Sequence, residues 1–79
     1  MPPEIPITAA AVNDGILVDG ELYVITAVDP ATSMFAAINV KLKDSDPSGA
    51  ITTFTPVTMI QLVAPGAGPA ILVFPVPPQ

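Results

Sequence analysis

The sequence contains no cysteine, no histidine and no tryptophan. Without cysteine there can be no disulfide, and without cysteine and histidine the usual ligands of a structural zinc ion are missing. A chain of 79 residues buries only about 60% of its unfolded surface, so its core is small. Domains of this size are usually reinforced by disulfides, metals or association. Association is the reinforcement that remains, and we expect the chain to bind other protein subunits.

Basic residues are almost absent as well. Lys41 and Lys43 stand against seven Asp and Glu, and the formal net charge is −5. Such a field repels phosphate backbones and anionic headgroups, so we expect neither nucleic acid nor membrane partners. The N-terminal residues lack the basic and apolar segments of a secretory signal. The apolar run 70–76 is far shorter than the roughly 20 residues of a membrane span. A soluble intracellular product is expected.

The sequence offers no arrangement of side chains for catalysis. Nucleophilic catalysis requires an activated nucleophile and a base, and the serines at positions 33, 45 and 48 lie in expected turns without a base. Residues 66–68 (GAG) lack the lysine and helix of a phosphate loop. The aspartates lie in turn signatures beside Gly, Pro or Ser, at Asp14, Asp19, Asp29, Asp44 and Asp46. We therefore predict no enzyme, no catalytic residue and no cofactor.

One turn allows a metal site as an alternative. Asp44, Asp46, Ser48 and Gly49 match the first, third, fifth and sixth positions of a calcium loop. The final position of that loop would be a threonine in place of a bidentate glutamate, and a proline interrupts it. We interpret residues 44–49 as a plain hairpin turn and predict no metal site, with cation binding as the open alternative.

The middle of the chain has the pattern of an antiparallel sheet. Asp19-Gly20 is a strong signal for a tight hairpin turn, between expected strands at 16–18 and 21–28. Residues 34–43 alternate in a way that predicts a half-buried strand. Its buried face is expected to carry Met34, Ala36, Ile38, Val40 and Leu42, and its exposed face Asn39, Lys41 and Lys43.

The following residues predict two more strands and a final extended segment. Strands are expected at 50–55 and 59–63, separated by a short 3₁₀ turn around Pro56. Residues 64–69 form a Pro/Gly linker, and residues 70–76 are strand-like. Four or five short strands with tight turns indicate an all-β domain of the small barrel or sandwich type.

Three stretches carry a resemblance to a known fold, namely residues 20–29 (GELYVITAVD), 35–37 (FAA) and 54–63 (FTPVTMIQLV). They resemble an SH3-like β-barrel, in which a one-turn 3₁₀ helix precedes the last strand, as residues 56–58 would. The resemblance covers residues 15–64 and implies a barrel of about five antiparallel strands. On this basis the chain divides into an extended N-terminal arm (1–14), the barrel (15–64) and a Pro-rich C-terminal arm (65–79).

Charge is distributed unevenly along the chain, with none beyond Asp46. An uncharged C-terminal segment rich in aliphatic residues is costly to leave in water, at about 25 cal/mol per Å² of apolar surface. We therefore expect residues 51–63 to form the domain's own core and the arms to bind a partner, with Phe74 as an aromatic anchor. The predicted partner-binding residues are Ile5, Ile71, Leu72, Val73, Phe74 and Val76.

A small acidic barrel with uncharged arms is similar to the cement, or decoration, proteins on the heads of tailed bacteriophages. The resemblance implies a structural protein that forms trimers or dimers, binds the major capsid protein and is located on the virion. The alternative is an SH3-like adaptor or accessory subunit that binds one protein partner in a cytoplasmic complex. Stoichiometry distinguishes these two functions.

Overall fold

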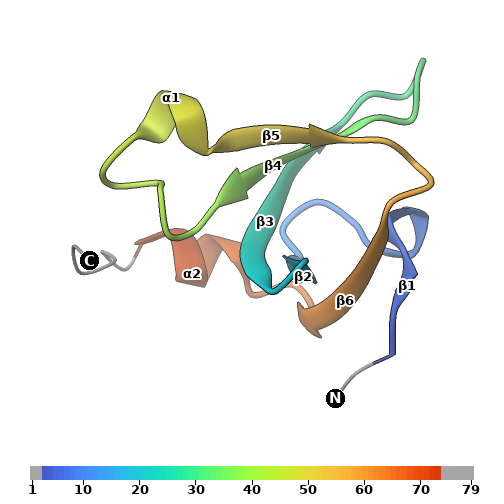
Figure 1. The fold of residues 1–79 in the computed structure, drawn as a ribbon, viewed down its shortest axis with the longest axis horizontal. Helices are drawn as coiled ribbons and strands as arrows, with labels where there is room; N and C mark the ends of the chain where they lie inside the picture. Colours follow the sequence, from blue (N-terminus) through green and yellow to red (C-terminus); the bar gives the residue numbers. More distant parts are fainter. Residues whose placement is uncertain (1–2, 74–79) are drawn as a thin grey trace.

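A computed structural model describes residues 3–73 of the chain, and its main element is an antiparallel β-sheet (Figure 1). The all-β prediction is confirmed in the coarser form that the described residues are mostly β. None of the helices among these residues has the length and apolar character needed to cross a membrane. Within residues 3–73 the strands are β1 (Ile5–Pro6), β2 (Gly15–Val18), β3 (Glu21–Val28), β4 (Phe35–Asn39), β5 (Ile51–Phe54) and β6 (Met59–Ala64). Three one- or two-turn helices accompany them: η1 (Ile7–Ala9), α1 (Pro47–Ala50) and α2 (Gly68–Val73).

The hairpin between β2 and β3 has the turn that the sequence predicts. Val18 pairs with Glu21, and the two residues between them both have positive φ angles, 52° at Asp19 and 80° at Gly20. This is the combination required by a two-residue turn whose twist matches that of the flanking strands. The hairpin fixes the register of the two central strands of the sheet.

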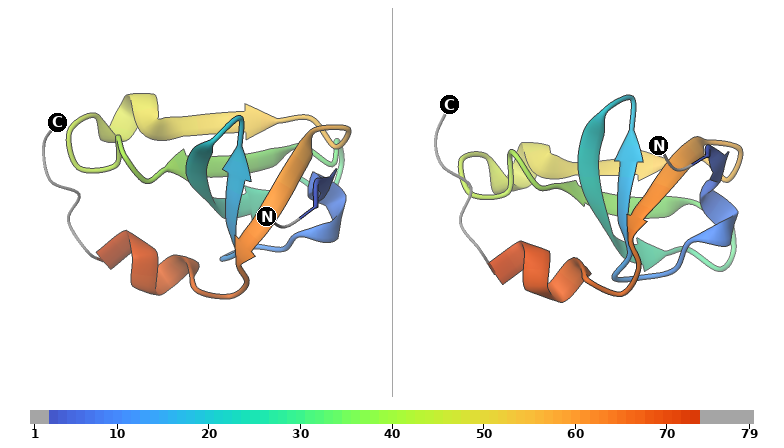
Figure 2. Two further views of the ribbon diagram at one scale, coloured as in Figure 1. Left: turned by 60° about the horizontal axis from the view of Figure 1, so that its bottom comes forward. Right: turned by 90° about the horizontal axis from the view of Figure 1, so that it is seen from below.

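The strand order in space is β1-β6-β2-β3-β4-β5. Strands β2 to β5 form a meander, after which the chain returns so that β6 pairs with β2. In the described residues the sheet is not closed, and β1 and β5 are its two edges. The predicted closed barrel is therefore not observed, although the sheet is curved around one side (Figure 2).

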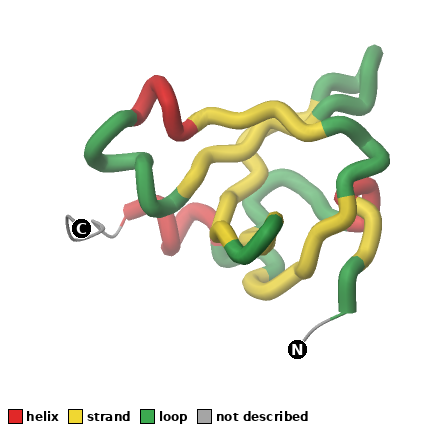
Figure 3. The backbone as a smooth tube through the Cα atoms, viewed as in Figure 1, coloured by secondary structure: helices red, strands yellow, loops and turns green. Residues whose placement is uncertain are grey.

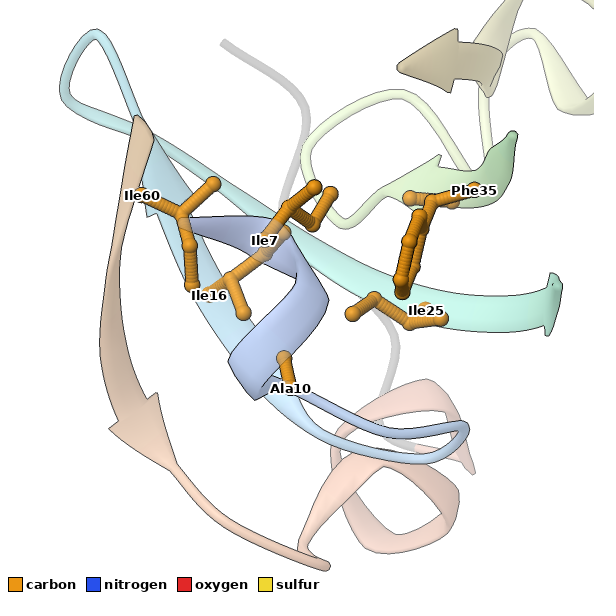
Figure 4. Packing of buried hydrophobic residues seen from close by; sticks show 7 residues of the cluster. Ile7, Ala10, Ile16, Ile25, Phe35 and Ile60 are labelled. Atoms are coloured by element: carbon orange, nitrogen blue, oxygen red, sulfur yellow. The ribbon is translucent and has the colours of Figure 1, made fainter. Parts of the chain in front are cut away.

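The core lies on one face of this sheet, which we call the inner face. Its buried residues come from strands and from the segment that includes η1, and Figure 4 shows Ile7 in the middle of the cluster. Tyr23 and Phe54 pack against it with their rings edge to face and their centroids 5.0 Å apart. The buried members of the cluster are Ile7, Ala10, Ile16, Ile25, Phe35, Ala37 and Ile60.

The N-terminal residues take part in this core, whereas the sequence predicts an extended arm for residues 1–14. Ile5 pairs with Ile60 across β1 and β6, and the N–H of Ile7 donates to the carbonyl of Thr58 at 2.8 Å. The Ile7 side chain is fully buried. Proline at position 6 is tolerated because β1 is an edge strand, where a missing N–H can face away from the ladder.

The predicted faces of β4 are wrong. Phe35, Ala37 and Asn39 are buried, whereas Ala36 and Ile38 are only half-buried. Both faces of this strand are apolar, so the alternation could not distinguish them, and the larger Phe35 pairs with Phe54 on the inner face.

The polar residues that suggested a wet face lie where β4 has ended. The Asn39 side-chain oxygen accepts from the backbone N–H groups of Lys41 (2.9 Å) and Leu42 (3.3 Å), which forms a turn. Lys43 is buried, and its ammonium pairs with the carboxylate of Asp44 at 3.0 Å. The strand therefore ends at Asn39, four residues earlier than the sequence predicts, because the turn begins there.

The strand-like segment predicted at 70–76 is helical in its described part. Residues 70–73 belong to α2, and the N–H of Ile71 donates to the carbonyl of Ala67 at 3.0 Å. Figure 2 shows α2 leaving the end of β6 and running away from the N-terminal segment. The segment is apolar throughout, so its composition fits a strand or a helix. The helix contacts β3, which is remote in sequence, and the local pattern could not show this contact.

Two glycines allow α2 to approach the sheet on the face opposite the core, which we call the outer face. A Cβ atom at Gly15 would lie 2.8 Å from the Ala64 Cβ and 3.2 Å from the Ile71 Cδ1. One at Gly68 would lie 2.7 Å from the Asn13 carbonyl oxygen, which accepts the Gly68 N–H at 2.8 Å. The helix is therefore held against β2 and β3 by close contacts that larger residues would prevent.

Candidate docking surface

The acidic side chains within residues 3–73 are distributed over several loops and the start of β3. No group of three or more His, Cys, Asp or Glu side chains comes together in this part of the chain. Asp44 pairs with Lys43, and Asp46 accepts the Gly49 N–H at 3.1 Å as the N-cap of α1. The segment 44–49, predicted as a hairpin turn, lies in the connection between the antiparallel neighbours β4 and β5. It begins as a turn and continues into the one-turn helix α1, whose first residue is Pro47, where a missing N–H costs nothing. The two carboxylates expected as alternative calcium ligands make these local contacts.

The residues predicted to bind a partner are divided between two ends of the molecule. Ile5 is half-buried in β1 and packs against the core. Ile71 and Leu72 are half-buried on α2, whereas Val73 is 74% exposed. Elements β1 and α2 lie at different ends in both views (Figures 1 and 2). The other two predicted residues, Phe74 and Val76, lie outside the described residues.

The most exposed of the large apolar side chains in the described residues is one that the sequence places in the core. Val57 is 81% exposed in the turn between β5 and β6, and Met59, at the start of β6, is 47% exposed. Met59 pairs with Pro6 across β1 and β6, and paired residues of an antiparallel ladder share a face. We call Pro6, Val57 and Met59 the end patch.

Hydrogen bonds stabilise the turn that carries Val57. The N–H of Thr58 donates to the carbonyl of Thr55 at 3.1 Å, and the two hydroxyl groups lie 3.2 Å apart. This is the tight turn that the sequence predicts around Pro56. The carbonyl of Thr58 in turn accepts the N–H of the buried Ile7. Val57 is therefore presented from a turn that is fixed to the core.

The charge around the end patch is low. Residues 47–63 carry no charged side chain, and β1 carries none either. The charge closest to Pro6 in the sequence is the exposed Glu4, which precedes β1. An apolar centre with a polar rim is the usual composition of a protein interface. The patch can therefore contact a neutral surface.

A second apolar feature crosses the outer face of the sheet. Gly15 pairs with Val24, Val24 with Ile38, and Ile38 with Ile51. The result is one row across four strands, with apolar side chains from β3, β4 and β5. Val24 is buried, Ile38 is half-buried and Ile51 is 58% exposed. The row therefore becomes progressively more exposed away from α2 and ends at the β5 edge.

One charged group lies on a hairpin that extends beyond the sheet. Figure 3 shows the loop between β3 and β4 reaching past the other elements at one corner. There the backbone N–H of Ala31 donates to the Asp29 carboxylate at 2.9 Å, and this bond, with help from the Thr32 hydroxyl, lowers the pKa of Asp29. The carboxylate stabilises the loop, and no second acidic group accompanies it there.

Sequence reasoning missed Val57 and Met59 because it assigned residues 51–63 to the domain's own core. Ile60 and Leu62 do face the core, but Met59 and Val63 are exposed. Both alternating sets of β6 contain large apolar residues, so periodicity alone could not show which set is exposed. Pro56 was the available signal, since a turn there brings the next residue to the surface.

Comparison of this chain with protein-family models, with curated proteins and with solved structures gave no match. The functional interpretation therefore depends on the surfaces described above.

Proposed function

We propose that this chain is a non-enzymatic structural protein that docks onto a larger protein assembly and braces it. The assembly favoured by the acidic charge and small β-rich fold is a tailed-phage capsid, with the major capsid protein as partner and the virion as location. The observation that carries the proposal is the exposure of Val57 on a turn that is hydrogen-bonded to the core. An apolar side chain held in place gains affinity because little conformational freedom is lost on docking.

Support for an SH3-like arrangement comes from the order of the elements. A four-strand meander, β2 to β5, is followed by a hydrogen-bonded turn at residues 55–58 and by a last strand that returns to pair with β2. We propose that the fold is an open variant of such a barrel. In this variant β1 extends the sheet beyond β6, and the segment containing η1 fills the space inside the curved sheet.

The docking mechanism differs from one based on two extended arms. Ile5 and Ile71 both contact this chain's own fold, so they contribute less apolar surface to a partner than the sequence implied. The end patch takes their place as the central contact, and the exposed Val73 marks a second position at the other end of the molecule. Several copies arranged around a symmetric lattice would each add a modest affinity, which multiplies through avidity.

Stoichiometry tests this function directly. Heads are assembled from a tailed-phage major capsid protein, the purified chain is added, and bound copies are counted by gel densitometry. We expect many copies per head at a fixed ratio to the capsid protein. The alternative, an adaptor for a single protein, is favoured by the open β5 edge, to which a peptide could add a strand. One-to-one copurification with a single protein, and no binding to heads, would establish the adaptor and contradict the cement function.

A matched pair of variants tests the end patch. Val57→Asp places a charge at the centre of the patch, and Val28→Asp places one at a 38% exposed position on the β3–β4 hairpin. We expect Val57→Asp to weaken head binding by more than about tenfold, which is about 1.4 kcal/mol, and Val28→Asp to leave it unchanged. Equal thermal midpoints would show that both variants fold. Equal head binding by both variants would exclude the end patch as the docking centre.

A further inference from the structure

The two edges of the sheet differ in their ability to pair with another strand. Strand β1 has two residues, one of which is Pro6 without an N–H donor. Strand β5 has four residues, Ile-Thr-Thr-Phe, with neither proline nor charge. Edge strands are normally protected from pairing by shortness, proline or charged side chains. The β1 edge is protected by its shortness and its proline. The β5 edge has neither proline nor a charged side chain, so it is the edge more able to pair with another strand.

Charge favours a second copy of the same chain as the partner of β5. Each copy carries a net charge of −5, so two copies can meet only where their charges are distant. Strands β4 and β5 contain no charged residue, and no charge follows β5 in the sequence. A strongly basic partner would have no acidic side chain to pair with along β5. A second copy of the same neutral edge would experience no charge repulsion along β5.

The alternation of side chains restricts how two β5 strands can pair. In an antiparallel pair, residues opposite each other point to the same face of the sheet. Thr52 and Phe54 lie on the inner face and Ile51 and Thr53 on the outer face, as their pairing with β4 requires. If the two-fold axis lay between Thr52 and Thr53, Thr52 would be opposite Thr53 of the second copy, and these side chains point to different faces. A central axis must therefore lie midway between the two copies of Thr52 or between the two copies of Thr53.

The exposed isoleucine selects between the two registers. With the axis at Thr52, Ile51 lies opposite Thr53 of the partner subunit, and the two Ile51 side chains become diagonal neighbours. Diagonal neighbours are about 7–8 Å apart, within reach of a long side chain. With the axis at Thr53, the two Ile51 residues would be much farther apart and would stay exposed. Either register forms a threonine–threonine pair at the axis, which is favourable in sheets, so the contact between the two Ile51 side chains decides between them.

We propose that the chain forms a two-fold symmetric dimer in which β5 pairs antiparallel with β5 of a second copy, centred on Thr52. The sheet is then continuous across both copies, and the apolar row Val24, Ile38 and Ile51 continues to the dimer axis. The end patch remains free in each copy. The inference deepens the proposed function, since it names the contact through which copies would associate before docking.

Cysteine substitution tests the register because the chain has no cysteine of its own. At the axis, Thr52→Cys brings two identical side chains opposite each other, with Cα atoms about 4.5–5.5 Å apart, a spacing that permits a disulfide. We expect Thr52→Cys to oxidise to a dimer quickly. Thr8→Cys, at an exposed position on η1, is the control and is expected to stay reduced far longer. Cross-linking at equal rates by both variants would overturn the proposed pairing.

The mass of the native chain in solution gives a second, independent readout. Light scattering on the full chain should give twice the 8.1 kDa of one copy, and Thr53→Lys, which adds a charge to the exposed edge, should return it to the monomer mass. A native chain that stays monomeric at its highest soluble concentration overturns the dimer. Head binding by Val57→Asp and by Thr53→Lys separates the two proposals. If Val57→Asp loses head binding and Thr53→Lys keeps it, the docking function is supported and the dimer is not required for it.

Discussion

The carboxylate of Asp14 joins two segments that are 52 residues apart in the sequence. One oxygen, Oδ1, accepts the backbone N–H of Gly66 at 2.8 Å, and the other, Oδ2, accepts the N–H of Ala11 at 2.9 Å. The neighbouring Asn13 carbonyl accepts the N–H of Gly68 at 2.8 Å. The turn before β2 is therefore hydrogen-bonded to the turn that leads from β6 to α2.

Substituting Asp14 should loosen α2 before the sheet. Asp14→Ala removes both acceptors, and we expect a loss of about 1–2 kcal/mol in the free energy of unfolding, since charged hydrogen bonds contribute about 1.5–3 kcal/mol each when buried and this group is only half-buried. Asp14→Asn keeps one acceptor oxygen and should lose less. Urea unfolding measures the stability, and hydrogen exchange should show faster exchange at residues 66–73. Unchanged exchange there would contradict the coupling.

Ile7 is expected to be among the most destabilising positions in the chain. Its side chain is fully buried in the middle of the core, so Ile7→Ala should cost about 2–5 kcal/mol through lost burial and a residual cavity. The adjacent Thr8 is exposed, and Thr8→Ala should stay within about 0.5 kcal/mol. Chemical denaturation of both variants gives the comparison. Similar midpoints would mean that the N-terminal segment is dispensable for folding.

Gly15 should not tolerate even one added methyl group. In Gly15→Ala the new Cβ would lie 2.8 Å from the Ala64 Cβ, and overpacking of this kind costs about 1–3 kcal/mol. The second substitution Ala64→Gly removes the clashing atom and should recover part of the loss. A double-mutant cycle by thermal denaturation measures this coupling. Additive effects of the two substitutions would show that the contact with Ala64 is not the cause.

The loop between β3 and β4 should lose a small contribution to stability in acid. The N–H of Ala31 lowers the pKa of Asp29 in the folded chain. A carboxyl group with a lowered folded pKa stabilises the fold above its unfolded pKa, about 3.9, and this contribution disappears as the pH falls through the folded pKa. NMR titration should place the Asp29 midpoint below that of the urea-unfolded chain. A midpoint at or above the unfolded one would contradict the hydrogen bond in solution.

Local signals in the sequence predicted the parts of the fold that depend on local chemistry. The Asp19-Gly20 turn, the full length of β3 and the turn at residues 55–58 follow from turn residues and β-branched runs. The faces of β4 did not follow, because both of its faces are apolar. The burial of Ile7 and the position of α2 depend on contacts with residues remote in sequence, at Thr58, Asn13 and Gly15.

The candidate docking surface was only partly predictable for a related reason. The sequence shows that residues 47–79 carry no charge, and in residues 3–73 exposed large apolar side chains occur both before this range, as at Val12, and within it, as at Val57. It does not show which apolar residues the fold itself uses. Ile5 and Ile71 are held by the core and by the sheet, while Val57, assigned to the core, is exposed. The turn at residues 55–58, which contains Pro56, accounts for the exposure of Val57.

The pairing of β1 with β6 sets a limit on how quickly the native state can form. Ile5 meets Ile60, and Ile7 bonds to Thr58, so the inner face stays open until β6 has joined both β1 and β2. The strand pairs β2–β3 and β4–β5 can form early because their connections are shorter. Their core side chains stay exposed to solvent until β6 has paired with β1 and β2. Folds dominated by such non-local pairing reach the native state in roughly milliseconds to seconds. During that interval the uncharged β5 edge is exposed on an incomplete molecule, and two nascent chains can meet through the same strand that would join two finished ones.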